Sequence, residues 1–191
     1  MIRHKLALLI ATTLITSGCV PLLIGGAATG VTAVHDRRSV GTVIDDKTIA
    51  LSLSAYLSRH SDQLGNSNVN VTAYNGIVLL TGETRNHELR QKIQGIASRQ
   101  EGVRKVHNYL SIGRNSTLSE RSYDTQQTAK VKTALFDISG KDFDPTRVKV
   151  VTEHGVTYLM GILSPSEARV VAQVARQVSG VKQIVTLFEV R

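Results

Sequence analysis

The sequence predicts an α+β fold made of two tandem copies of one small unit, each in the order helix, strand, strand, helix, strand. The first observation is an internal repeat, because residues 69–82 and 148–161 carry the same strand–turn–strand pattern at an offset of 79 residues. The second is an amphipathic helical period after each of these segments. The third is a Gly-Val pair that follows each helix and leads into an apolar strand. Repetition at a fixed offset indicates one structural unit per copy.

The first element of each copy is an amphipathic helix. Apolar residues three or four positions apart lie on one face of a helix, which is the face expected to pack on a sheet. The apolar positions are Ile49, Leu53 and Leu57 in the first copy and Val131, Ala134 and Leu135 in the second.

Two strands joined by a tight turn come next. The turn residues are Asn75-Gly76 in the first copy and His154-Gly155 in the second. Asn-Gly favours a two-residue type I′ hairpin because both central residues need a positive φ. His is a poorer first residue for such a turn, so the second hairpin is the weaker prediction. A further glycine recurs in each second strand, at Gly82 and Gly161.

A second amphipathic helix and a last strand complete each copy, which gives a small three-stranded mixed sheet packed on two helices. The last strands are expected at residues 103–112 and 181–190, and the units at residues 46–114 and 124–191 with a polar linker at 115–123. The apolar helix positions are Leu89, Ile93, Ile96 and Ala97 in the first copy and Ala168, Val171, Ala172, Ala175 and Val178 in the second.

The N-terminus is typical of a secretory signal that ends before Cys19. Arg3 and Lys5 precede an uncharged apolar segment, and small residues follow it before the single cysteine. This order resembles a bacterial lipoprotein signal, in which residues 1–18 are removed and the thiol of Cys19 is lipidated. Residues 19–45 would then form a flexible tether. Two alternatives stay open, an ordinary cleaved signal with a leftover core cysteine and an uncleaved anchor.

The net charge and the cysteine count limit the kinds of molecule that this protein is expected to bind. The chain has 191 residues, a net charge of +8 and one cysteine, which excludes an internal disulfide. A basic protein outside the cytoplasm is not expected to meet nucleic acid. We expect anionic lipid headgroups or acidic envelope proteins as its partners instead.

No set of residues in the sequence predicts catalysis. The six histidines show no metal-ligand spacing with a cysteine or carboxylate, and neither a nucleophile motif nor a phosphate-binding loop is present. We therefore expect a binding protein, without an enzymatic activity, a metal site or a cofactor.

Together, the repeated motifs resemble the BON-domain family. They are Gly76, Gly82 and Gly102-Val103 in the first copy, and Gly155, Gly161 and Gly180-Val181 in the second. The chain is similar to outer-membrane lipoproteins that carry two BON domains. This resemblance implies a lipid-anchored protein of the outer membrane that faces the periplasm. It also implies binding of anionic phospholipids such as phosphatidylglycerol and cardiolipin, a role in envelope integrity, and association with division sites.

The resemblance implies that the first helix of the second copy contacts lipid. On that helix we select Lys130 and Lys132 for headgroup contact and Phe136 for apolar contact. A protein-interaction adaptor for outer-membrane assembly or for control of cell-wall hydrolases is the alternative. It would use exposed strand edges and the basic second helix of the first copy. A membrane-lytic, haemolysin-like activity is a third hypothesis.

Overall fold

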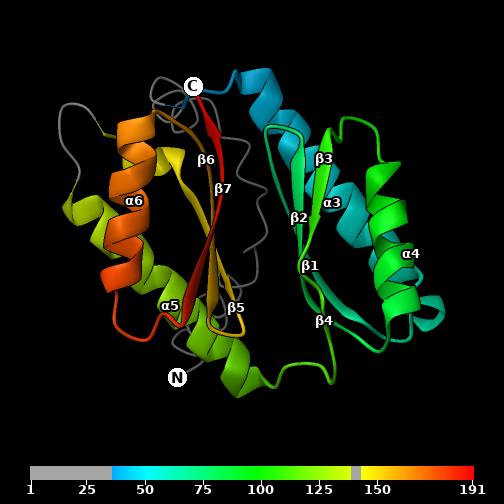
Figure 1. Ribbon diagram of the computed structural model, residues 1–191. Helices are drawn as coiled ribbons and strands as arrows, with labels where there is room; N and C mark the ends of the chain where they lie inside the picture. The colour runs from blue at the N-terminus through cyan, green and yellow to red at the C-terminus, as the bar shows by residue number, and fades with distance from the viewer. Residues whose placement is uncertain (1–35, 139–142) are drawn as a thin grey trace, which may run out of the picture. The chain divides into compact units, whose positions relative to one another are not determined.

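The computed structural model describes residues 36–138 and 143–191, and it contains the predicted element order twice (Figure 1). The first repeat contains α3 (Val40–Arg59), η1 (Asp62–Leu64), β1 (Asn68–Tyr74), β2 (Ile77–Thr84), α4 (His87–Ser98), β3 (Lys105–Asn108) and β4 (Ser111–Ile112). The second repeat contains α5 (Leu118–Asp137), η2 (Pro145–Arg147), β5 (Lys149–Glu153), β6 (Val156–Leu163), α6 (Pro165–Gln177) and β7 (Gln183–Val190). The predicted α+β class is confirmed.

Each repeat forms a small mixed sheet in which the second strand is central. β1 and β5 pair antiparallel with β2 and β6, whereas β3, β4 and β7 pair parallel with those central strands. The last strand of the first repeat is divided into β3 and β4, because Tyr109 and Leu110 interrupt it and Leu110 is buried in the core. The last strand of the second repeat is continuous.

The predicted helix faces form the two helix–sheet cores. Ile49, Leu53 and Leu57 on α3 pack with Ile93 and Ala97 on α4 in the first repeat. The second core has the equivalent composition, and its buried members are Val131, Leu135, Val148, Val150, Leu159, Leu163, Val171 and Ala175. The helical periodicity of the sequence therefore identified most of the helix positions that fill both cores, whereas the predicted positions Leu89 and Ala134 are only half-buried.

Two helices begin inside the ranges expected for the tether and the linker. α3 begins at Val40, inside the expected tether, because the Ser39 side chain accepts a hydrogen bond from the backbone N–H of Thr42 and caps the helix. α5 begins at Leu118, inside the expected linker, because Thr117 and Glu120 form a capping box. Each first helix therefore extends into the range that precedes its unit in the sequence.

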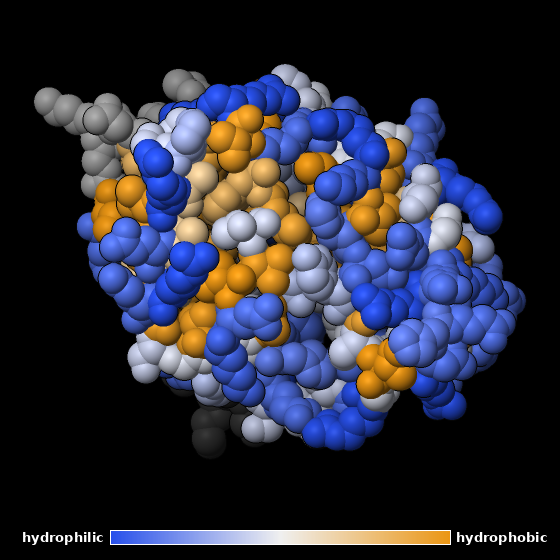
Figure 2. Space-filling view, in the orientation of Figure 1, coloured by the Kyte–Doolittle hydropathy of each residue, from blue (hydrophilic) through white to orange (hydrophobic). Residues whose placement is uncertain are grey.

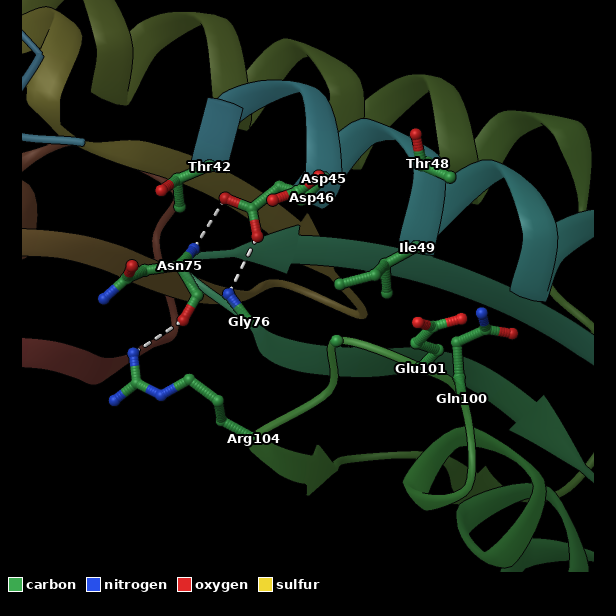
Figure 3. Close-up of a pocket in the computed structure, with 11 residues that line it drawn as sticks. Thr42, Asp45, Asp46, Thr48, Ile49, Asn75, Gly76, Gln100, Glu101 and Arg104 are labelled. Carbon is green, nitrogen blue, oxygen red and sulfur yellow. Dashed lines mark hydrogen bonds between the residues drawn. The ribbon is translucent and has the colours of Figure 1, made fainter. Parts of the chain in front are cut away.

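In both repeats, a buried aspartate on the first helix holds the hairpin turn. The carboxylate of Asp46 accepts the backbone N–H groups of Asn75 at 2.6 Å and Gly76 at 2.8 Å (Figure 3). Asp124 accepts those of His154 at 2.8 Å and Gly155 at 2.9 Å. All four turn residues have positive φ, so both hairpins adopt the predicted backbone conformation. Each first helix is thus tied to the sheet on which it packs.

The faces of the two sheets that carry no helix pack against each other (Figure 1). Tyr74 and Leu79 of the first repeat share an apolar cluster with Tyr158 and Met160 of the second. The rings of Tyr109 and Tyr158 lie 4.9 Å apart between centroids, and the Tyr74 hydroxyl donates to the backbone oxygen of Arg147 at 3.0 Å. The interface between the repeats is therefore an apolar core with polar contacts.

The residues just before α3 contact both repeats. Arg37 forms a two-bonded ion pair with Glu167 of the second repeat, at 2.7 and 3.0 Å. Arg38 pairs with Asp46 at 2.8 Å, and its guanidinium lies 3.8 Å from the centre of the Tyr74 ring. Adjacent arginines therefore link the start of the described chain to the two repeats.

We predict that Asp124→Ala lowers the free energy of unfolding by about 2–3 kcal/mol, because two backbone N–H groups, one buried and one part-buried, lose a charged acceptor. Urea unfolding followed by circular dichroism measures the change. Asp45→Ala is the matched control, since Asp45 is exposed beside the first-repeat aspartate Asp46. Equal stability of Asp124→Ala and the wild-type protein would show that the turn does not depend on this carboxylate.

Candidate functional site

The structure places three of the four predicted site residues. Cys19 lies outside the described residues. Lys130, Lys132 and Phe136 all lie on α5 and are exposed, with 54% of Phe136 accessible to solvent. All three are available for contact with a ligand.

The helix geometry separates the two predicted lysines. Val131 lies between them and is fully buried, and residues two apart on an α-helix are rotated by about 200°. Lys130 and Lys132 therefore leave α5 on opposite flanks of its buried stripe. Phe136, four residues after Lys132, lies on the flank of Lys132. The structure thus associates Lys132 with Phe136 and separates Lys130 from both.

Lys132 lines a groove that both repeats build. Asn70 and Thr72 come from β1, Lys149 from β5, and Thr128 and Lys132 from α5. A second hollow continues it, since both hollows are lined by Thr72 and Lys149, and the second adds Lys47 from α3. The larger hollow has a volume of about 420 Å³. We call these two continuous hollows the inter-repeat groove.

Three lysines from different elements line this groove. Among the described residues, no carboxylate forms an ion pair with any of the three, which are Lys47, Lys132 and Lys149. Desolvation lowers the pKa of Lys149, and the positive charges of Lys132, Arg38 and Lys47 lower it further. These like charges repel one another, and a bound anion would relieve that repulsion.

The carboxylates along the groove already have partners. Asp46 and Asp124 bind the two hairpin turns, and Asp46 also pairs with Arg38. Glu153, at one end, accepts a hydrogen bond from the side chain of Asn70 at 2.7 Å. Threonine hydroxyls and lysine ammonium groups therefore remain as donors for a ligand. Such donors suit a phosphate group.

Both helices beside the groove expose large apolar side chains. On α5 these are Leu118, Tyr123 and Phe136, of which Leu118 is 79% exposed. On α3, Val40, Ile44 and Leu51 are between 57% and 72% exposed. Lys47 follows Ile44 by three residues and precedes Leu51 by four, so all three side chains lie on one face of α3. Among the described residues, no helix has the length and apolarity needed to cross a bilayer.

A separate pocket lies beside the first hairpin turn and has a volume of about 470 Å³ (Figure 3). Its polar lining is mostly engaged in structural contacts, since Asp46 binds the turn and Arg104 donates to the Asn75 backbone oxygen at 2.9 Å. Asp45 and Glu101 make its remaining charge negative. The pocket does not suit an anionic ligand.

A shallow groove lies between α6 and β7. It is lined by Ala168, Ala172, Phe188 and Val190, with Arg169, Gln173, Arg176 and Thr186 around them. Apolar side chains gather over this part of the second repeat, with hydrophilic side chains around them (Figure 2). β7 is the last strand in the order β5-β6-β7, so its outer edge is unpaired within the described sheet. This surface could accept an extended segment of another protein.

Sequence reasoning did not find the buried aspartates or the role of Lys47 and Lys149. Asp46 and Asp124 are separated by 78 residues and each precedes its apolar stripe, so an alignment of the first helices would have revealed the pair. Lys47 and Lys149 carry no comparable local signal, because they come together only when the two repeats pack.

Comparison with known proteins agrees with this architecture. The BON domain model matches residues 45–114 and 123–191, which are the two repeats. The chain belongs to the BON-domain family. It is 33% identical over 185 residues to "Outer membrane lipoprotein DolP" of Haemophilus influenzae, which covers 97% of this chain and 95% of that protein. The predicted resemblance is confirmed, and the chain is a DolP-like protein with two BON domains.

Other similarities are weaker in coverage or in fold. The chain is 33% identical over 153 residues to "21 kDa hemolysin" of Actinobacillus pleuropneumoniae, covering 80% of this chain and 78% of that protein. A solved structure of CdsD, a structural protein of the type III secretion system of Chlamydia trachomatis, was also matched. The match covers 75% of this chain and 62% of the CdsD chain. Its TM-score is 0.28 and its sequence identity 13%, which says nothing about function.

We predict that Lys132→Gln raises the pKa of Lys149, because it removes a neighbouring positive charge that now lowers that pKa. An NMR titration of the Lys149 side-chain resonances from pH 8 to about 12 measures the change. Lys130→Gln, on the opposite flank of α5, is the control and should leave the Lys149 titration unchanged. A Lys149 pKa equal in all three proteins would mean that the lysines do not interact.

Proposed function

We propose that this DolP-like protein is a lipoprotein of the outer membrane, anchored through Cys19 and facing the periplasm, that binds anionic phospholipids. The inter-repeat groove is the headgroup site in this proposal, and phosphatidylglycerol and cardiolipin are the expected lipids. The observation that carries the proposal is the convergence of Lys47, Lys132 and Lys149, which pair with no carboxylate of the described ranges 36–138 and 143–191, between two helices that expose apolar side chains.

The electrostatics favour an anionic surface. A basic residue close to an anionic bilayer contributes about 1 kcal/mol, and the attraction decays within a Debye length. Three lysines on one groove therefore give binding of modest strength that salt weakens. The large apolar side chains on α3 and α5 would add affinity where they reach the acyl region.

The lipid anchor makes modest affinity sufficient. Two or more acyl chains hold a protein at a membrane stably, and a tethered domain meets the same membrane at high effective concentration. Recognition of headgroups by the groove would then orient the two repeats on the surface. We propose that this contact supports outer-membrane integrity, with a role at the division site.

We predict that Lys132→Gln with Lys149→Gln weakens binding to liposomes containing phosphatidylglycerol or cardiolipin by about fivefold per lysine at low salt. Co-sedimentation measures the affinity, and liposomes of phosphatidylcholine alone give the baseline. Lys132→Gln alone should account for about one fivefold step of this loss. Lys130→Gln makes the same change of charge as that single variant, on the other flank of α5, and should bind nearly as the wild-type protein does. Equal losses in the Lys130 and Lys132 variants would remove the groove as the site.

We predict that Cys19→Ser releases the protein from the membrane fraction, because serine carries no thiol for lipid attachment. Membrane fractionation and mass spectrometry of the mature N-terminus measure this outcome. An acyl mass on the residue at position 19 of the wild-type protein supports the anchor. Full membrane retention of the serine variant would favour an uncleaved N-terminal anchor.

A second candidate function is a periplasmic adaptor for proteins of outer-membrane assembly or cell-wall hydrolase control. The observation that favours it is the apolar groove beside the unpaired edge of β7. This surface is formed by other elements than the inter-repeat groove, so the two functions are compatible. Crosslinking from a photoreactive residue placed at Thr186 would capture such a partner. Lipid binding at α5 should be unchanged in the same variant.

The name of the Actinobacillus relative adds lysis as a third candidate. The buried faces of the four described helices are occupied by the helix–sheet cores, so insertion of those faces into a membrane would cost both cores. We therefore propose that the protein binds the membrane surface and does not lyse the membrane.

A further inference from the structure

Three side chains that commonly bind metals meet where the two repeats join. Glu83 lies at the end of β2, Glu153 at the end of β5, and His154 in the turn after β5. One carboxylate oxygen from each glutamate and one ring nitrogen of His154 lie within 4.8 Å of one another. Ligands from both repeats therefore converge on one point.

Neighbouring side chains hold the two carboxylates in place. Asn68 donates to one oxygen of Glu83 at 2.8 Å, and Asn70 donates to one oxygen of Glu153 at 2.7 Å. The two asparagines are two positions apart on β1, so their side chains lie on the same face of the strand. Metal-binding carboxylates generally receive such hydrogen bonds, which fix their orientation.

The cluster concentrates negative charge in a buried location. Glu83 is fully buried and Glu153 is 7% exposed. The His154 ring forms a hydrogen bond with Glu83, and the Ser116 hydroxyl donates to the same carboxylate. The nearby cation Arg114 is paired with Glu120 instead. A cation at this point would offset the repulsion between the carboxylates.

The backbone of His154 has a positive φ, which is uncommon for any residue other than glycine. Its φ is 54°, and the equivalent position of the first repeat holds Asn75, which tolerates a positive φ better. Asn-Gly is the preferred pair for such a turn, whereas the histidine ring reaches the carboxylate of Glu83 in the other repeat. The ring is 43% exposed, so it has room to turn outward and admit an ion beside Glu83.

We propose that Glu83, Glu153 and His154 bind a divalent transition metal ion of the zinc type that bridges the two BON domains. Imidazole and carboxylate ligands suit zinc, and three protein ligands leave a coordination position for water. Because the ligands come from both repeats, the ion stabilises the packing of the repeats and the groove that depends on it. This inference does not depend on lipid binding.

The test is thermal unfolding of the full chain, without an affinity tag and with Cys19→Ser in every sample so that no thiol competes for metal. Zinc at one hundred times its Kd should raise the Tm by about 5–10 °C relative to protein treated with a chelator. Isothermal titration calorimetry measures the Kd and the stoichiometry, which should be one ion per chain.

His154→Asn is the decisive variant, because asparagine occupies the equivalent turn of the first repeat and should keep the hairpin intact. It should lose the zinc-dependent rise in Tm, as should Glu153→Gln. His87→Asn is the matched control, since His87 is exposed at the start of α4 and should retain the full response. Absence of a zinc response in the parent protein, or an equal response in His154→Asn and the parent, would overturn the proposal.

Discussion

The packing of the two sheets against each other is the contact on which the rest of the molecule depends. Each sheet uses one face for its own helices and the other for the partner repeat, so both faces are buried. Tyr74 and Leu79 meet Tyr158 and Met160 there. This contact brings β1 beside β5 and thereby creates a groove that neither BON domain has alone.

The buried aspartates explain why the first helix of each repeat keeps a fixed position beside that groove. Asp46 and Asp124 anchor α3 and α5 to the hairpin turns through backbone N–H groups, which are independent of side-chain identity. Lys47 and Lys132 are carried on these same helices. The lysines are therefore presented by elements that are held at both the apolar core and the turn.

Much of the fold could be predicted from the sequence, because helix period and strand alternation are local signals. Ile93 and Val171 were correctly placed in cores by spacing alone, and the Asn75-Gly76 turn by residue chemistry. The start of α5 lies inside the expected linker, where Thr117 and Glu120 carry a recognisable capping signal that the helical period does not include. The groove could be predicted only in part from the sequence. The approach of Lys47 to Lys149 is set by packing between the repeats rather than by any local pattern.

The central claim is that both BON domains contribute to one lipid-binding groove. Chemical-shift mapping of the isotope-labelled protein with micelles of a short-chain phosphatidylglycerol tests it most directly. We expect shifts at Lys47 in the first repeat and at Lys132 and Lys149 in the second to follow one binding curve and to disappear together at high salt. Shifts confined to the second repeat, with Lys47 unaffected, would contradict it.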